Sequence, residues 1–375
     1  MTTTAPSPAR DYRVDFVRGL ALLFIFINHV PGNIVSFLTL RTVALCDASE
    51  VFIFMAGFSA ALVFCIRERR IGFLGAAIDV WRRTWSLYVV HIFVFVLFVA
   101  QVAWTAARVD NPAFVEEMLV AEFLTEPHIA VVEALVLRFQ PRFLDILPLY
   151  ILLLAAVPLV MALPWRALPL AALASLALYL GVQLGGWHLK AYPDERPWTF
   201  NPLGWQMLFF IGLVLGRATA EGRRLIPRSR PLIWLAALYA GGFCLPVGVS
   251  WAIAGTWEAF PALLSDELWP LRKPDLDPWR LANLLAIAYL VATLVPKQAS
   301  WFLSPLARPV TLAGRHGLDL FCLGIFLSVF GHAILTEVGS SLWIHVAVSG
   351  VGCAVMIGYA AGKEWLDRQG REAAR

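Results

Sequence analysis

Two ionisable residues in the first long apolar stretch have a spacing that suits chemistry. Arg18 and His29 are eleven residues apart among mainly apolar side chains. In an α-helix this spacing gives about three turns plus 20°, so both side chains point to one face, about 16 Å apart. Such a face resembles the lining of a passage. The alternative is structural: Arg18 reaches lipid phosphates, and His29 is hydrogen-bonded within a helix bundle.

Two acidic residues open the second apolar stretch. Asp47 and Glu50 are three residues apart, so they share one face of a helix. The direction of the chain places them at the same level as His29. A carboxylate beside an imidazole fixes its tautomer and raises its basicity, as a general base requires. The alternative is a pair of solvated acids at a helix N-terminus, where the helix dipole favours negative charge.

Basic residues lie toward the other ends of these stretches. Arg82 and Arg83 open the third stretch. Guanidinium groups bind phosphates well, although positive charge at this place also fits a topology signal. The ninth stretch carries Arg315 and His316 at one end and His332 at the other. A lipid-facing helix would not carry this set, so we expect it to face a cavity.

Further polar residues lie at the outer ends of two other apolar stretches. Asp145 and Tyr150 open the fourth stretch, and Trp205 with Gln206 opens the sixth. Their hydrogen-bonding groups could hold a hydroxylated acceptor. For any single Trp, an anchor at the membrane interface is the alternative interpretation.

The composition indicates that these residues belong to a membrane protein. Of 375 residues, 59% are hydrophobic and only 15% are charged, whereas about a quarter is usual in soluble domains. The mean hydropathy is +0.71. The net charge of +4 could attract nucleic acid, but the positive charges lie in short loops between apolar stretches, as topology signals do. We therefore expect a lipid bilayer as partner and no nucleic acid. No cluster has metal-ligand spacing, so no metal is expected.

The elements that would position the candidate residues are about ten transmembrane helices. We expect an all-α, polytopic helix bundle that forms one domain over residues 1–375. The distribution of Lys and Arg predicts cytoplasmic termini, with tails at 1–13 and 363–375. An outer loop at 107–145 is predicted to form short amphipathic helices. The predicted spans are 14–31, 43–66, 84–106, 146–163, 167–184, 203–217, 231–253, 281–296, 309–335 and 341–362.

The pattern resembles the OpgC family of membrane acyltransferases, within the acyltransferase-three superfamily. Arg18 followed after ten residues by His29 is similar to the signature spacing of the superfamily. Asn28 stands where many members of the OpgC branch have Asp, which shifts the expected role of an acid to Asp47 and Glu50. The similarity runs from about residue 11 to 362. The motifs that carry it are Asp15-Phe16-x-Arg18-Gly19, Asn28-His29-x-Pro31-Gly32-Asn33, Asp47-x-x-Glu50-Val51-Phe52, Phe54-Met55-Ala56-Gly57-Phe58, Asn201-Pro202-x-x-Trp205-Gln206 and Gly324-Ile325-Phe326-Leu327-Ser328 with His332.

The resemblance implies acyl transfer across the bacterial inner membrane. Acyl-coenzyme A, most simply succinyl-coenzyme A, would be a co-substrate, with no tightly bound cofactor. The acceptor would be a periplasmic glucan. His29, with Asp47 and Glu50, would act as general base on a glucan hydroxyl or would carry the acyl group itself. The implied donor residues are Arg18, Arg82, Arg83, Arg315 and His316, and the implied acceptor residues are Asp145, Tyr150, Trp205, Gln206 and His332.

Two other functions stay open on the sequence. The same chemistry could transfer an acetyl group to another cell-surface glycan. A small-solute transporter would instead use Arg18 and His29 in a permeation path. Transporters are often built from inverted repeats or paired broken helices, and neither is found in the sequence. The sequence gives no oligomeric state.

Overall fold

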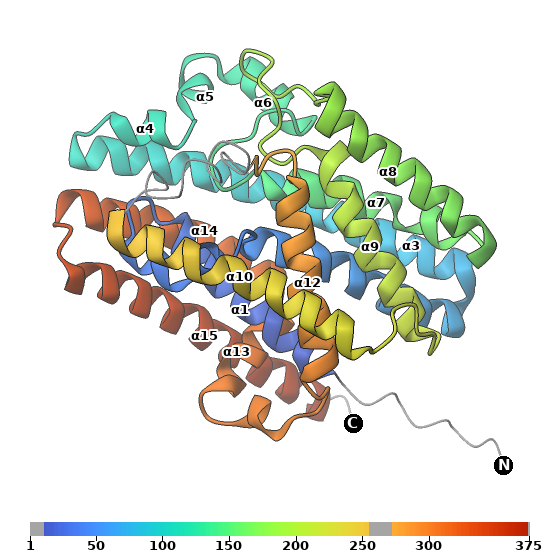
Figure 1. Cartoon of the computed structure of the whole chain (residues 1–375). Helices are drawn as coiled ribbons and strands as arrows, with labels where there is room; N and C mark the ends of the chain where they lie inside the picture. Colours follow the sequence, from blue (N-terminus) through green and yellow to red (C-terminus); the bar gives the residue numbers. More distant parts are fainter. Residues whose placement is uncertain (1–10, 255–271, 374–375) are drawn as a thin grey trace.

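The chain folds into α-helices and short 3-10 helices. The computed structural model describes residues 11–254 and 272–373, with the backbone alone for 243–254, Arg371 and Ala373. No β-strand occurs in these two ranges, which confirms the predicted all-α class. Figure 1 shows the helices packed side by side. They are α1 (Tyr12–His29), η1 (Ile34–Leu38), α2 (Leu40–Val43), α3 (Ala48–Val109), α4 (Ala113–Glu117), α5 (Ala121–Thr125), α6 (Pro127–Leu135), α7 (Ile146–Met161), η2 (Trp165–Ala167), α8 (Leu168–Gly185), α9 (Pro202–Ala220), α10 (Arg230–Ala254), α12 (Pro278–Leu294), η4 (Ser300–Leu303), α13 (Ala307–Ala313), η5 (Gly314–His316), α14 (Gly317–Glu337) and α15 (Leu342–Ala373).

The predicted spans fall largely on these helices. Two shorter apolar helices, Ile146–Met161 and Pro278–Leu294, coincide with the fourth and eighth predicted spans. The first and seventh predicted spans fall on α1 and α10. Within the described residues, five helical stretches are long and apolar enough to cross a membrane: Ala48–Val109, Trp165–Gly185, Pro202–Ala220, Ala307–Glu337 and Leu342–Gly370.

Helix α3 contains a sharp bend at Gly72. This residue has φ 76° and ψ 170°, a conformation that glycine adopts readily because it has no Cβ atom. A straight helix would separate Arg67 from Asp79 by about 18 Å, yet their side chains form an ion pair at 3.6 Å. The bend therefore folds the chain back on itself, and α3 holds the second and third predicted spans in its two arms.

Glycines let several helices approach one another closely. A Cβ atom on Gly57 of α3 would lie 2.2 Å from the carbonyl oxygen of Phe209 in α9, and one on Gly212 would lie 2.4 Å from that of Phe54. A Cβ atom on Gly19 of α1 would lie 1.9 Å from the carbonyl oxygen of Val310 in α13. Gly57 thus lets α3 and α9 pack backbone to backbone, as small residues do at helix contacts in membranes.

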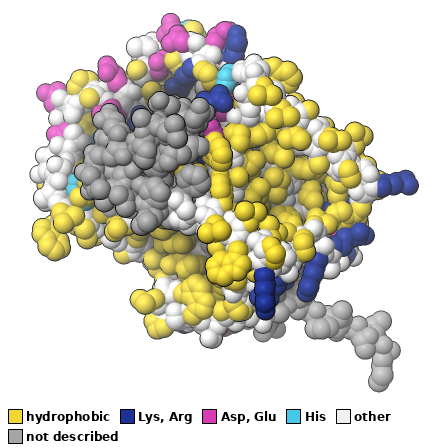
Figure 2. Space-filling model, viewed as in Figure 1, with side chains coloured by type: hydrophobic (Ala, Val, Ile, Leu, Met, Phe, Trp, Pro, Cys, Tyr) yellow, Lys and Arg dark blue, Asp and Glu magenta, His cyan; other side chains and the backbone are white. Residues whose placement is uncertain are grey.

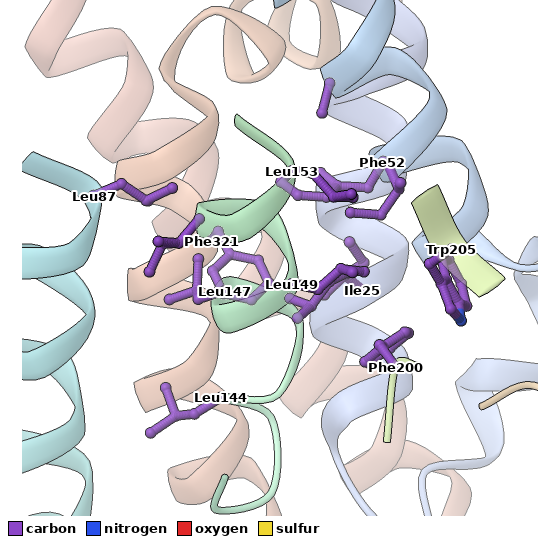
Figure 3. Close-up of a cluster of buried hydrophobic side chains, with 14 of the residues drawn as sticks. Ile25, Phe52, Leu87, Leu144, Leu147, Leu149, Leu153, Phe200, Trp205 and Phe321 are labelled. Carbon is purple, nitrogen blue, oxygen red and sulfur yellow. The ribbon is translucent and has the colours of Figure 1, made fainter. Parts of the chain in front are cut away.

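Helix α7 lies inside the main buried cluster of apolar side chains. Figure 3 shows Leu147, Leu149 and Leu153 of this helix at the centre of the cluster. Leu87 and Phe321 lie on one side of them, and Phe52, Phe200 and Trp205 lie on the other. Helices α1, α3, α9 and α14 therefore contribute side chains to the same buried cluster as α7, and α3 and α9 pack directly against it.

The short helices α4, α5 and α6 lie along the second arm of α3, as Figure 1 shows. The hydroxyl of Tyr88 donates to the carbonyl oxygen of Leu135 at 2.8 Å. Phe95 packs edge-on against Phe123 and Phe139, with ring centroids 5.5 and 5.7 Å apart. Residues 107–145 thus form short helices, as predicted, and these helices pack along the second arm of α3.

Charged side chains mark two opposite edges of the molecule. Figure 2 shows Asp and Glu side chains along the edge that carries α4–α6, several Lys and Arg side chains projecting from the opposite edge, and apolar side chains between them. The start of α1 meets the end of α15, because Arg315 lies 3.8 Å from Asp15 and 3.3 Å from Glu364. The predicted tails 1–13 and 363–375 fall partly outside the described residues.

Candidate active site

His29 is the last residue of α1, and its imidazole is stacked on the ring of Phe143. The ring centroids are 4.6 Å apart and the ring planes differ by 23°. Phe143 has φ 72°, which is strained for a bulky residue, so the surrounding fold must hold its ring in this place. Nδ1 of His29 is buried and has no hydrogen-bond partner in the described part of the chain. This nitrogen therefore has unused hydrogen-bonding capacity.

Asp47 and Glu50 cap the N-terminus of α3. The carboxylate of Asp47 accepts from the backbone N–H of Ser49 at 2.7 Å, and the carboxylate of Glu50 accepts from the backbone N–H of Asp47 at 2.9 Å. This reciprocal capping explains their spacing. They are not simply solvated acids, because the side chain of Glu50 has no exposed surface. Two buried carboxylates require positive partners.

Lys273 and Arg280 are those partners. Lys273 Nζ lies 2.7 Å from Asp47 Oδ2. Arg280 Nη2 lies 2.5 Å from Glu50 Oε1 and 3.4 Å from Asp47 Oδ2. Neither cation was predicted from the sequence. Two features of the sequence could have identified them. Acids at the level of a buried imidazole need positive partners, and Arg280 directly precedes a predicted span.

The relation of the two acids to His29 differs from the expected one. No hydrogen bond joins the imidazole of His29 to Asp47 or Glu50 among the described residues. Lys273 and Asp47 are nevertheless close enough for their charges to act on the imidazole. The structure therefore places His29 beside a balanced cluster of two cations and two carboxylates, whose own hydrogen bonds are directed mainly at one another.

The turn that carries Lys273 is held by its backbone carbonyl groups. Trp205 is fully buried, and its indole N–H donates to the carbonyl oxygens of Lys273 and Pro274 at 3.2 and 3.0 Å. Trp205 was predicted to hold an acceptor, but in the structure its polar atom fixes this turn. Further donors to the turn are Asn201 N to Pro274 O at 2.9 Å, Gln183 Nε2 to Asp275 O at 2.8 Å and Tyr179 OH to Leu276 O at 2.7 Å.

The neighbouring Gln206 points elsewhere. Its Nε2 atom donates to the carbonyl oxygen of Ser175 in α8 at 2.8 Å, and its Oε1 atom accepts from the hydroxyl of Ser175 at 2.7 Å. Gln206 thus joins α9 to α8 and contributes no contact to the turn. The sequence grouped Trp205 with Gln206, but successive residues of a helix face in different directions.

Two predicted acceptor residues lie near the cluster. Asp145 is at the N-cap of α7, two residues after Phe143, and burial raises the pKa of its carboxyl group, opposed by the charge of Lys273. Tyr150 lies one turn further along and is edge-on to Phe52, with ring centroids 6.0 Å apart. Both side chains are partly exposed.

The carboxylate–imidazole pair that the sequence suggested for His29 occurs at His332. Its Nε2 atom lies 2.6 Å from Glu117 Oε2 in α4. Its ring is also edge-on to Phe114, at 5.1 Å between centroids. His332 thus ties α14 to the short helix α4. Its Nδ1 atom is buried and has no hydrogen-bond partner among the described residues.

Three of the five predicted donor residues gather at the other end of α1. The guanidinium of Arg18 donates to the hydroxyl of Ser59 and, at 3.4 Å, to the carbonyl oxygen of Gly314. Arg315 and His316, the next two residues, both face Glu364 of α15.

Arg82 and Arg83 lie apart from this group. Both side chains are exposed on the second arm of α3. No contact among the described residues joins either of them to Arg18, Arg315 or His316. The five predicted donor residues therefore fall into two sets: Arg18, Arg315 and His316 lie together, and Arg82 and Arg83 form a separate exposed pair.

One comparison with known proteins gives a match. The model of a protein family described as OpgC protein matches residues 10–368, nearly the whole chain. The matched stretch includes every candidate residue described above, from Arg18 to His332. A search of curated proteins returned no match, and neither did a search of solved structures.

Proposed function

The chain belongs to the OpgC protein family, and we propose that it is a membrane O-acyltransferase. The proposed reaction moves an acyl group, in the first place succinyl, from acyl-coenzyme A to hydroxyl groups of a periplasmic glucan. The observation that carries this proposal is the buried, unpartnered Nδ1 atom of His29 beside the charged cluster of Asp47, Glu50, Lys273 and Arg280.

The proposed location is the bacterial inner membrane, with ten spans and both termini in the cytoplasm. Two features support this orientation. Lys and Arg side chains project from the edge opposite the acidic helices α4–α6 (Figure 2), as the positive-inside rule requires. The start of α1 and the end of α15 also lie at one end of the bundle, joined through Arg315. In this orientation His29 and Asp145 lie toward the periplasm.

His29 would act on the hydroxyl of the glucan. Its imidazole accepts the hydroxyl proton as the oxygen attacks the thioester carbon, and the C–S bond then breaks. The thiolate of coenzyme A takes up the proton, so the products are the glucan ester and free coenzyme A. In the second route the imidazole attacks the thioester itself and passes the acyl group on. Both routes use the same unpartnered nitrogen.

Lys273 would stabilise the negative charge that develops on the carbonyl oxygen. An ammonium group has three N–H donors, and the contact with Asp47 Oδ2 uses one of them. The side chain is 38% exposed, which leaves donors for a ligand. Positive charge fixed in advance at a developing oxyanion lowers the barrier without reorganisation. The hydrogen-bonded turn around Lys273 is the kind of support that such fixed charge needs.

The donor would enter from the opposite end of α1. Arg18, Arg315 and His316 would face its phosphate groups there. The extended arm of coenzyme A would then cover the distance to His29, which is about 16 Å along the helix. Arg82 and Arg83 stay candidates for a first, exposed contact with the donor.

The test uses the purified full chain in lipid nanodiscs with succinyl-coenzyme A and a linear β-glucan. The expected result is glucan-dependent release of free thiol together with glucan that gains mass by succinyl groups. Acetyl-coenzyme A in place of the succinyl donor separates the two acyl choices. Absence of thiol release with either donor, combined with solute uptake by liposomes that contain the protein, would replace the enzyme with a transporter.

A further inference from the structure

Helix α15 continues well past its apolar part. Its apolar stretch ends near Gly362, and its last turns, to Ala373, carry charged residues. The first of these polar turns is held against the bundle by two ion pairs. Lys363 pairs with Asp319 of α14, and Glu364 pairs with Arg315 at 3.3 Å. We call residues 363–373 the α15 extension.

Glu364 lies between Arg315 and His316 of the proposed donor group. Its Oε1 atom is 3.3 Å from Arg315 Nη1, and its Oε2 atom is 3.7 Å from His316 Nε2. Arg18 lies next to this group, because it donates to the carbonyl oxygen of Gly314 at 3.4 Å. Glu364 is therefore one of two carboxylates beside Arg315, since Asp15 Oδ2 lies 3.8 Å from Arg315 Nε, and it is the nearer of the two.

Glu364 accepts a hydrogen bond from Arg315 Nη1 at 3.3 Å, but other polar atoms of this group stay unpaired. Arg315 Nε and His316 Nε2 are buried and have no hydrogen-bond partner among the described residues. The His316 side chain is only 8% exposed. Buried donors without acceptors are costly and rare. A phosphate group has three acceptor oxygens and can bind a guanidinium through two parallel bonds, so it would satisfy donors that a single carboxylate leaves unpaired.

We propose that Glu364 is an internal competitor for a phosphate-binding site formed by Arg315 and His316. A ligand that carries phosphate groups displaces this carboxylate, and the α15 extension is the latch that opens when it binds. That the ligand is acyl-coenzyme A rests on the proposed function, whereas the anion site does not. The pair of Lys363 with Asp319 still holds the extension when Glu364 loses its charge, so Glu364→Gln is expected to fold.

The test measures binding of inorganic pyrophosphate and of coenzyme A to the full chain in nanodiscs by calorimetry. Glu364→Gln keeps the size of the side chain and removes its charge. It should lower the Kd for both ligands by roughly three- to tenfold, because a competing charged contact is lost. Glu372→Gln, on an exposed residue of the same extension, is the matched control and should leave Kd unchanged. Arg315→Gln should abolish pyrophosphate binding.

An unchanged or raised Kd for pyrophosphate in Glu364→Gln would overturn the proposal, as would absence of pyrophosphate binding in every variant. If Glu364→Gln bound pyrophosphate more tightly but no variant bound coenzyme A, the proposed displacement of Glu364 would be supported and the proposed acyltransferase function would be contradicted. A second measurement needs no variant. Hydrogen exchange in residues 363–373 of the native protein should speed up when pyrophosphate is added, and unchanged exchange would contradict displacement.

Discussion

The guanidinium of Arg280 lies 2.5 Å from the carboxylate of Glu50, a side chain with no exposed surface. Breaking one partner of a buried pair costs about 3–5 kcal/mol, because the other charge is left uncompensated. We therefore expect Arg280→Met alone to lower the thermal unfolding temperature strongly. The double variant Arg280→Met with Glu50→Gln should regain much of the loss. If the double variant were as unstable as the single one, the pair would not be the cause.

His29 is expected to be essential for transfer and dispensable for folding. His29→Ala leaves the stacked ring of Phe143 without its partner, a loss of about 1 kcal/mol of packing. Its transfer rate should fall by about 10²–10⁴, the usual effect of removing a general base. Thiol release measures the rate, and thermal unfolding checks the fold. A stable variant with near-normal activity would remove His29 from the mechanism.

Local periodicity predicted the features that depend on neighbours in the chain. The shared face of Asp47 and Glu50 follows from their helical spacing. The pairing of these acids with Lys273 and Arg280 joins residues 226 and 230 positions apart, and no local pattern encodes it. Lys273 also lies in a turn rather than in a periodic element. The buried carboxylates of Asp47 and Glu50 require positive partners. Only the packing of α12 and its preceding turn against α3 shows which residues these partners are.

Arg82 and Arg83 are exposed, so their role can be tested without loss of the fold. If they guide the phosphate groups of the donor, Arg82→Ala and Arg83→Ala should each raise the KM for acyl-coenzyme A, with little change in kcat. Because the contacts would be exposed, an effect of about two- to fivefold is expected. Arg70→Ala, on an exposed arginine before the bend of α3, is the control. If the KM for acyl-coenzyme A were the same in all three variants, Arg82 and Arg83 would act only as topology signals.

Gly57 should tolerate no larger side chain. A Cβ atom there would lie 2.2 Å from the carbonyl oxygen of Phe209, so Gly57→Ala must push α9 away from α3. Overpacking of this kind costs about 1–3 kcal/mol. Gly358→Ala is the matched control, because no atom lies within 4 Å of its added Cβ. The control should be neutral or slightly stabilising. Equal unfolding temperatures for the two variants would show that the approach of α3 and α9 is not tight.

Trp205 and Gln206 are adjacent in sequence, and the structure gives them separate tasks that kinetics can distinguish. Trp205→Phe keeps an aromatic ring against Phe200 but removes the donor to the carbonyl oxygens of Lys273 and Pro274. The turn should loosen, and kcat should fall by about fivefold, the equivalent of one lost hydrogen bond of about 1 kcal/mol. The KM for the donor should not change, because its phosphate groups are proposed to bind at the other end of α1.

The control for this prediction is Gln206→Leu. It removes the contacts with Ser175 in α8 and none with the turn, so it should lower stability while kcat stays close to that of the native protein. The measurement is a steady-state titration of each substrate for both variants, with thermal unfolding in parallel. If Gln206→Leu lowered kcat and raised the KM for the glucan while Trp205→Phe was silent, the acceptor would contact Gln206 after all, and the turn would not position Lys273 for catalysis.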